Sequence, residues 1–523
     1  MKKIVFVFEE NSLFVSSHMD KDTPAETRFF DSISYVMLPL IRMCENLIKD
    51  GIKFQFAISF SPIYCDMLTD KVFINRYRES LEKKLIFSEN EKKRIGNDKK
   101  MLDALEDSIQ FIKNNLSLFE KISCDIISKI NSIARSGFIE IIPTTASSIF
   151  LPLYKRFPDA IHAQIQLGKL SYSNYFHANK IQGFYSPFLG FFRGMGKILK
   201  LYGYEYSILS GSAFLLSKKA PKSGVFAPAI TDNGFKLLST DTNTYYDLVF
   251  SPQAYQKNEI YLNNRSDIGF ALHDRDYLLP LFDLEKGWQF VGFRYYSKKD
   301  GEVYDKNKAI LQAKKDAYSF VNARYQILKE VEKSSSLKNP VSLMLMPSNL
   351  LGFKWTEGFI WLEEVFRCID KIEDIETIFP RDAIALIEKP NKVEPFYSSL
   401  LDSNYSEELF TEDNDWIYRY VIKATERLKS IVNMFDSPTS LNIRTLNQAT
   451  REVTLMQSAY WSILLNNKCY KNYATKKFKN LVKSFTYIYE TLGAGMEETK
   501  CLTKREQEIP ILKDIDYTCY KKR

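Results

Sequence analysis

Short, continuous apolar runs alternate with amphipathic segments over the first three quarters of the chain, and this alternation narrows the possible folds more than any other feature. The runs lie at residues 3–8, 54–60, 138–142, 181–185, 206–209, 224–227 and 341–346. A short apolar run bounded by turn-forming residues is typical of a buried strand. Strands that alternate with helical segments indicate a parallel sheet or barrel. The sequence therefore predicts an α/β fold here.

Helical patterns fill the spaces between several of these runs. Residues 31–50 predict one amphipathic helix, which Asp31 can cap and Gly51 can end. Residues 72–135 are charged and helical in pattern without an apolar run, so they predict a helical insertion or a long crossover.

The pattern changes after about residue 395, where long helical segments at 414–435, 441–465 and 470–492 follow one another. This change predicts three parts: an α/β domain over 1–395, a helical domain over 396–495, and a loosely attached basic tail over 496–523.

Composition limits the classes of function. The 72 basic and 64 acidic residues are interspersed and leave a net charge of only +8, so no nucleic-acid partner is expected. Seven cysteines stand singly without a CxxC pair, which favours a reducing compartment. The first apolar run is too short for a signal peptide and no run is long enough to span a membrane, so we expect a cytoplasmic protein with no membrane partner.

Local motifs point to little chemistry. GFFRGMGK (190–197) fails the phosphate-loop spacing, and the four histidines are isolated, so we expect no cofactor and no metal. The best local acids are Glu9 and Glu10, directly after the first apolar run. We expect them to be solvated loop residues rather than functional acids, because charged residues at strand ends are usually exposed.

Several segments, in order along the chain, together resemble glycoside hydrolase family 57, in particular its 1,4-α-glucan branching enzyme group. They include FIEIIPTTASSIFLPL (138–153), GFYSPFLGFF (183–192), SGVFAPA (223–229), LLGFKWTEG (350–358) and LNQATREVTLMQSAYWSILL (446–465). The resemblance covers about residues 4–490. It implies a seven-stranded (β/α) barrel with a helical insertion and a C-terminal all-α domain, and a role in α-glucan metabolism.

The resemblance also implies that the catalytic positions are substituted. The family's nucleophilic glutamate falls on Phe188, and its acid/base aspartate falls on Pro347. Four more polar positions differ. The two histidines of the first motif fall on Glu9 and Asn11, the histidine of the second motif falls on Ser148, and an aspartate of the last block falls on Tyr460.

Retaining glycosidases need two carboxyl groups about 5–5.5 Å apart, and neither Phe188 nor Pro347 can supply one. Residues near the implied cleft could still bind α-glucan or a maltooligosaccharide. They are Tyr185, Trp355, Trp416, Trp461, Glu9 and Asn11. Trp416 and Trp461 could instead be core residues, whereas Trp355 follows a strand end and is expected to face the cleft. Phe188 could extend a sugar platform or fill the emptied pocket.

We therefore expect a catalytically inactive relative that binds α-glucan or serves as a regulatory partner of a protein in glycogen metabolism. Two alternatives stay open. The first is an active branching enzyme or glucanotransferase that uses relocated carboxylates, such as Glu9 or Glu10. The second is a purely structural interaction protein whose cleft is closed.

Overall fold

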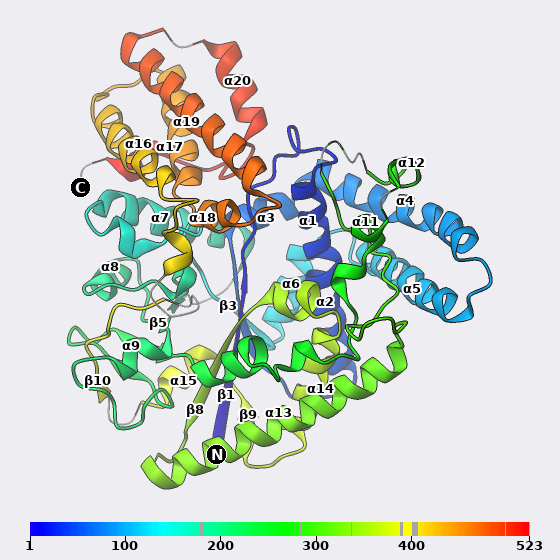
Figure 1. The fold of residues 1–523 in the computed structure, drawn as a ribbon. Coiled ribbons are helices and arrows are strands. Elements are labelled where there is room, and N and C mark those ends of the chain that lie inside the picture. The colour runs from blue at the N-terminus through cyan, green and yellow to red at the C-terminus, as the bar shows by residue number, and fades with distance from the viewer. Residues whose placement is uncertain are drawn as a thin grey trace.

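A computed structural model describes residues 1–177, 182–272, 274–282, 285, 287–335, 337–387, 391–399, 406–496 and 498–521. Ile181, in one predicted strand, and His273 lie outside these residues. Figure 1 shows an α/β body with a helical hairpin on one side and a helical domain above it. The α/β fold predicted from the alternation, with a helical region at the C-terminal end, is thus confirmed.

The described strands form two sheets. The first contains β1 (Lys2–Glu10), β2 (Phe56–Phe60), β3 (Ile139–Ile141), β8 (Val341–Pro347) and β9 (Ile375–Thr377), all parallel. The second contains β4 (Gly183–Phe184), β5 (Tyr206–Leu209), β6 (Ala229–Ile230), β7 (Lys236–Ser239) and β10 (Asn391–Lys392). Only β6 and β7 pair in antiparallel fashion among these described strands.

Two contacts join the sheets. Thr240, directly after β7, forms a parallel bridge with Leu343 of β8. Tyr185, directly after β4, donates its backbone N–H to the carbonyl of Pro143 after β3 at 2.8 Å. These contacts link the described strands in the ring order β3-β2-β1-β8-β7-β5-β4, so the carboxyl ends of all seven strands face one end of the α/β body.

One predicted strand is absent, and four strands, β6, β7, β9 and β10, were missed. Residues 224–227 form turns, in which the Gly224 N–H bonds to Pro221 and the Phe226 N–H bonds to Ser223. The turn backbone overrides the apolar content of this run. The missed strands are at most four residues long, which leaves little periodicity to detect.

Helices surround the strands. The larger ones in the α/β body are α1 (Pro24–Ser32), α2 (Leu38–Lys49), α3 (Pro62–Leu68), α6 (Ile126–Arg135), α7 (Pro158–Tyr175), α8 (Met195–Leu201), α13 (Lys306–Ser335) and α14 (Gly358–Asp370). Within the predicted insertion, α4 (Lys71–Ile95) and α5 (Lys99–Lys121) form the projecting hairpin of Figure 1.

The helix expected over 31–50 begins earlier and contains a π turn. Thr23 caps α1, and the π-helical segment η1 (Ile33–Met37) joins α1 to α2. Pro39 has no N–H to donate to Tyr35 four residues earlier, and a π turn accommodates that loss. Gly352 packs against this turn so closely that a Cβ atom there would lie 1.7 Å from the Tyr35 carbonyl oxygen.

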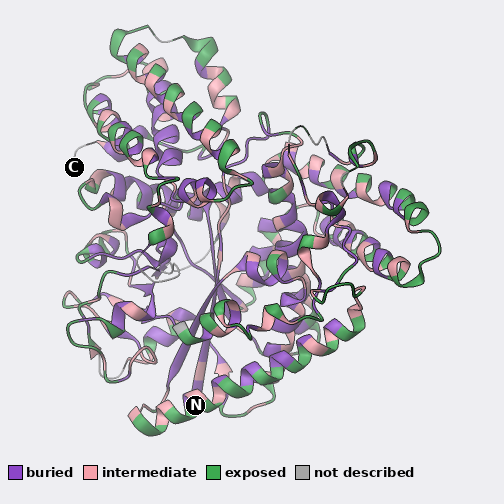
Figure 2. Ribbon diagram, viewed as in Figure 1, coloured by how far each residue is buried: buried purple, intermediate pink, exposed green. Residues whose placement is uncertain are grey.

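The strands carry the core. Residues 4–8 of β1 are at most 1% exposed, and β2 is buried throughout. Figure 2 shows the same burial along the strands, with exposed residues on the outer helix faces. Parallel strands covered on both faces need apolar residues on both sides, which explains why their sequences are continuous apolar runs.

The C-terminal domain contains α16 (Trp416–Val432), α17 (Ser440–Met456), α18 (Tyr460–Asn466) and α19 (Lys471–Ala494). The last residues are not the loose tail that we expected. α20 (Thr499–Glu508) packs on α17, and Ile509, Ile511 and Tyr520 are at most 2% exposed. Charged residues of both signs lie before and between these buried side chains, such as Arg505, Lys513 and Asp514, so the charge of this segment concealed an apolar anchor.

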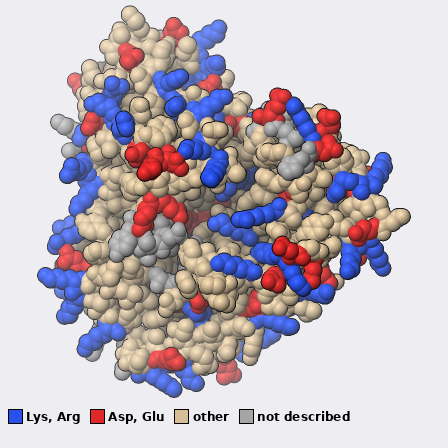
Figure 3. Space-filling view, viewed as in Figure 1, with Lys and Arg blue, Asp and Glu red and all other residues tan. Residues whose placement is uncertain are grey.

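The surface gives two further findings. No helix in the described part of the chain is both long enough and apolar enough to cross a bilayer. On the face shown in Figure 3, blue and red side chains are intermixed over the α/β body and the helical domain.

Candidate functional site

The candidate site lies at the carboxyl ends of the strands, where the parallel register brings several predicted residues together. Glu9 of β1 pairs with Pro347 of β8, and Glu10 pairs with Phe60 of β2. The position expected to carry the acid/base aspartate is therefore next to Glu9. Carboxyl ends of parallel strands are where α/β proteins place their functional groups.

Glu9 is held by a polar network that joins three strand ends. The Tyr185 hydroxyl donates to Glu9 Oε2 at 2.5 Å, and the Asn11 amide donates to Glu9 Oε1. The Ser148 hydroxyl then donates to Asn11 Oδ1 at 2.9 Å. The structure thus brings together four of the residues named from the sequence.

Glu10 is more deeply buried, at 4% exposed, and its oxygen lies beside the Ser348 hydroxyl. Burial raises the pKa of Glu10 to about 8 and that of Glu9 to about 7. Ser348 already donates to the Glu9 carbonyl at 3.0 Å, and a hydroxyl has one proton to give. A protonated Glu10 would therefore donate to Ser348.

Phe188 closes the opposite side of the site. Its side chain is 8% exposed and belongs to an apolar cluster with Phe150, Leu409 and Ala459. Its ring lies 5.8 Å from the ring of Tyr460, measured between centroids. Of the two roles considered for Phe188, the structure favours filling the pocket, because little of the ring remains free to contact a sugar.

The backbone around this cluster is strained. Phe188 and Leu189 have φ values of 55° and 51°, and Ser148 has a φ of 55°. Residues other than glycine rarely adopt this left-handed region, and each costs on the order of 1–3 kcal/mol. Hydrogen bonds hold the turn, including one from the Ser186 hydroxyl to the Gly190 carbonyl at 2.6 Å. Such strain is typical of functional sites.

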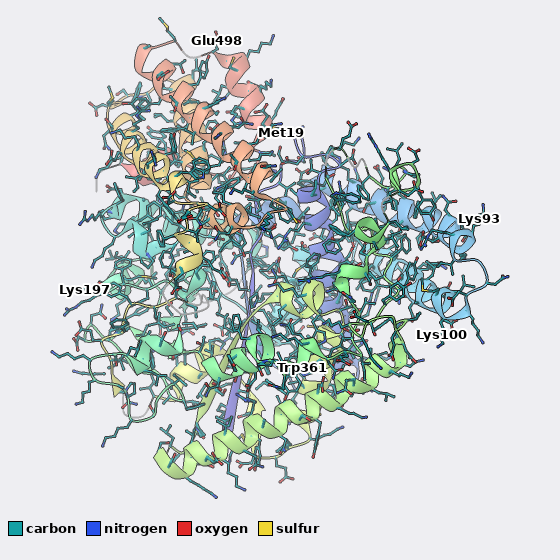
Figure 4. All side chains as sticks on the ribbon, viewed as in Figure 1. Met19, Lys93, Lys100, Lys197, Trp361 and Glu498 are labelled. Atoms are coloured by element: carbon teal, nitrogen blue, oxygen red, sulfur yellow. The ribbon has the colours of Figure 1, made fainter. Side chains whose placement is uncertain are left out.

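Two of the tryptophans proposed as sugar-binding residues are core residues. Trp355 is 1% exposed, and its ring lies 5.4 Å from Tyr261 and 5.3 Å from Trp361, which Figure 4 labels. Trp461 is 2% exposed and donates its indole N–H to the Leu455 carbonyl at 2.8 Å. A buried ring has no face to offer a sugar, so both differ from our expectation.

Trp416 and Tyr185 also have structural contacts. Trp416 begins α16, donates its indole N–H to Asp413, and lies edge-on to Phe478 at 5.5 Å. Trp416 keeps part of its surface exposed. Tyr185 is 1% exposed, so its hydroxyl serves the Glu9 network and its ring is not free for stacking.

Beside Glu10 lies a cavity of about 100 Å³ that sequence reasoning did not find. Its lining includes Glu10, Asn11, Arg28, Phe353, Tyr460 and Tyr470. The Arg28 guanidinium lies 5.6 Å from the Phe353 ring and 5.5 Å from the Tyr470 ring. These residues come from α1, from the segment after β8 and from the helical domain, so no local motif could have indicated them.

No group of three or more His, Cys, Asp or Glu side chains suited to a metal ion occurs within the described ranges. The site's chemistry is that of two neighbouring carboxyl groups, amide and hydroxyl donors, and aromatic walls. Neutral polyhydroxy compounds suit such a mixture, because their hydroxyls both donate and accept hydrogen bonds while their C–H faces pack on rings.

With this geometry established, the comparisons identify the family. Residues 21–395 match glycosyl hydrolase family 57, and residues 420–520 match the C-terminal domain of 1,4-alpha-glucan branching enzyme. The first match spans well over half of the chain. The chain belongs to glycosyl hydrolase family 57, and the family resemblance seen in the sequence is confirmed.

Individual relatives agree with this assignment. The 1,4-alpha-glucan branching enzyme TK1436 of Thermococcus kodakarensis is 24% identical over 502 residues, covering 91% of this chain and 71% of the relative. The structure of the alpha-amylase AmyC of Thermotoga maritima matches with a TM-score of 0.90 and 22% identity, covering 100% of this chain and 99% of the other. The branching enzyme of Pyrococcus horikoshii matches with a TM-score of 0.88 and 22% identity, covering 100% and 97%. At this identity the structural matches show the shared fold.

Proposed function

We propose that this chain is an α-glucan-binding member of family 57 that does not catalyse glucan transfer or hydrolysis. One observation carries the proposal. At the tip of the strained turn after β4, where family resemblance places the nucleophile, Phe188 is packed into an apolar cluster. An aromatic ring cannot form a glycosyl-enzyme intermediate, and loss of such a group typically costs 10⁴–10⁶ in rate.

Binding of α-glucan is supported by the polar and aromatic cavity beside Glu10 and by the relatives. The matched enzymes are described as branching enzymes and an alpha-amylase, and the structure of the Thermococcus relative is described as a complex with glucose. A protein that binds glucan without cleaving it would serve as a regulatory or scaffold partner in glycogen metabolism.

The competing function is catalysis by relocated carboxylates. The raised pKa values of Glu9 and Glu10 support it, because a general acid needs a carboxyl group that keeps its proton near neutral pH. Their geometry counts against it. They are consecutive residues of one strand, and successive strand side chains point to opposite faces. Glu9 bonds to Tyr185, whereas Glu10 lies against Ser348 and the cavity. A retaining mechanism needs two carboxyl groups on either side of one bond.

The test is incubation of the purified chain with amylose, with α-1,6 branch points and reducing ends measured against a boiled sample. We expect neither product. Turnover within a hundredfold of an ordinary glucan-transferring enzyme would contradict the proposal, and its loss in Glu9→Gln or Glu10→Gln would establish the relocated acids.

Binding is measured separately by calorimetric titration with maltoheptaose. We expect weak binding that strengthens with oligosaccharide length, because each added sugar contributes contact without further ordering of the protein. No heat of binding at millimolar sugar would favour the third possibility, a structural interaction protein with a closed cleft.

A further inference from the structure

A larger cavity, of about 320 Å³, is lined by residues of α2, α5 and α14 and of the segment that joins β8 to α14. Figure 1 labels these helices. Its volume is within the range of small-molecule sites, about 300–1,000 Å³. None of the described residues that line it belongs to the Glu9 network or the Phe188 cluster. Which ligand could fill this cavity is therefore a separate question from what binds beside Glu10.

Two buried charged side chains line this cavity. Arg294 is 2% exposed, donates to Asn264 at 2.9 Å and pairs with Asp267 at 3.4 Å. Glu357 is 1% exposed and accepts the Leu262 N–H at 3.0 Å. Nη2 of Arg294 and Oε2 of Glu357 have no hydrogen bond of good geometry, although the Tyr35 hydroxyl interacts with Arg294 and the Tyr304 hydroxyl interacts with Glu357. Buried polar atoms are nearly always bonded, so these two call for an explanation.

Aromatic side chains supply the apolar part of the lining. Tyr35 and Phe111 stack with centroids 5.0 Å apart, and the Arg294 guanidinium lies 4.6 Å from the Tyr35 ring. Tyr304 and Phe359 line the same cavity. Rings beside a few convergent polar groups are the usual composition of a ligand site.

The charges of the lining balance. Three basic residues, Arg42, Arg294 and Lys306, are matched by three acidic ones, Asp107, Glu357 and Glu363. Lys306 and Asp107 also pair with each other at 3.1 Å. A site for an anion or a cation would carry an excess of the opposite charge. The balance favours a neutral ligand with both donors and acceptors.

We infer that this cavity is a second saccharide site, which takes the end of a short α-glucan chain. A sugar hydroxyl can accept from Arg294 and another can donate to Glu357, while the C–H faces of the sugar pack on the rings. The choice of α-glucan, rather than another neutral polyol, rests on the proposed function. The site would hold glucan on the hairpin side of the molecule, independently of the cavity beside Glu10.

Matched serine-to-tryptophan variants test the inference by calorimetric titration with maltotriose. Ser108, on α5, lines the large cavity, so Ser108→Trp fills it. Ser117 is exposed on the same helix and does not line the cavity, which makes Ser117→Trp the control. Ser12 lines the cavity beside Glu10, so Ser12→Trp blocks that site instead.

We expect Ser108→Trp to weaken one of two binding events by about tenfold or more, since the indole takes the space of a sugar unit. Ser117→Trp should bind like the parent. Glu357→Gln, which alters no packing, should weaken the same event several-fold, so the test does not depend on one bulky variant. Thermal melts confirm that each variant is folded.

Each outcome separates this inference from the proposed function. Parent-like binding by Ser108→Trp, with loss in Ser12→Trp, would overturn the second site and leave the proposed function intact. Loss only in Ser108→Trp would support the second site and contradict binding beside Glu10. Absence of maltotriose binding by the parent protein would overturn the second site, whereas the maltoheptaose titration decides the proposed function.

Discussion

The ends of β1 and β4 both contribute to the candidate site, although β2 and β3 stand between them in the ring, and their chemistry is opposite. The β1 end carries Glu9, Glu10 and Asn11 in a hydrogen-bonded network. The β4 end carries Phe188 in an apolar cluster closed by Tyr460. Tyr185 bridges the two ends through its bond to Glu9. A mechanism that needs carboxyl groups from two strands has acids on only one of them.

At the β4 end, the backbone conformation and the side chain point to different conclusions. The turn after β4 keeps two consecutive left-handed residues, Phe188 and Leu189, although the side chain it presents is apolar. Strain of this kind persists only where the surrounding structure enforces it. Here the hydrogen bonds of Ser186 and the packing around Phe188 enforce it. The scaffold of a functional turn is therefore present without a reactive group.

The largest expected effect comes from giving the β4 end the chemistry of β1. Phe188→Glu places a carboxyl group among Phe150, Leu409 and Ala459 and should lower the free energy of unfolding by about 3–5 kcal/mol at pH 8. Phe188→Gln has a similar shape without the charge. We expect the two variants to match at acid pH and to diverge as the pH rises, as measured by urea denaturation.

A second prediction concerns the branching activity of a double variant at positions 188 and 347. Adding Pro347→Asp to Phe188→Glu restores carboxyl groups at both positions implied by the family resemblance, yet we expect no branching of amylose. The neighbouring Glu9, Asn11 and Ser148 form a network of their own and would not orient the new groups. Robust branching by the double variant would show that the rest of the site is intact.

The sequence predicted features that depend on neighbouring residues better than features that depend on contacts between distant segments. Strands and helices follow from local periodicity, so β1, β2, β3, β5 and β8 and the C-terminal helices were foreseeable. The burial of Trp355 depends on Tyr261 and Trp361, which periodicity does not place. The order of family-like segments added the barrel, which no single segment indicates.

The site was predicted in part for the same reason. Glu9 was named from its place after the first apolar run, and Asn11, Ser148 and Tyr185 were named from the family resemblance. Parallel pairing brings the strand ends that carry them together. The cavity wall formed by Arg28, Phe353 and Tyr470 comes from three distant segments, so it required the tertiary structure. Likewise, the apolar anchor at Ile509–Ile511 was concealed by the charged residues on either side of it.

A smaller effect is expected from Glu10 at the polar end. Its pKa is raised from the ordinary 4.5 to about 8, so the folded state holds a proton that the unfolded state has released between these pH values. Stability therefore falls as the pH rises from about 4.5 to about 8. Glu10→Gln removes this pH dependence. The free energy of unfolding of the variant, relative to that of the parent, should therefore be higher at pH 8 than at pH 5 by on the order of 2–4 kcal/mol.

Urea denaturation at a series of pH values measures this dependence. Glu82→Gln is the control, since Glu82 is exposed on α4 and far from the network in sequence. We expect the Glu82 variant to follow the parent at every pH. If Glu10→Gln also follows the parent, the carboxyl group is not protonated in the folded protein, and the contrast between the two strand ends is smaller than the structure indicates.

The smallest effect tests the bridge between the ends. Tyr185→Phe removes the hydroxyl that donates to Glu9, and Tyr204→Phe removes a buried hydroxyl that has no hydrogen-bond partner. Both rings are 1% exposed, so packing losses are similar. We expect Tyr185→Phe to cost about 1–2 kcal/mol and Tyr204→Phe to change stability by less than about 0.5 kcal/mol.

Because the Tyr185 bond lowers the pKa of Glu9, its removal should raise that pKa further above 7, which NMR titration of the Glu9 carboxyl group can follow. Equal stability losses in the two variants, with an unmoved Glu9 titration, would mean that Tyr185 only fills space and that the two strand ends are not coupled.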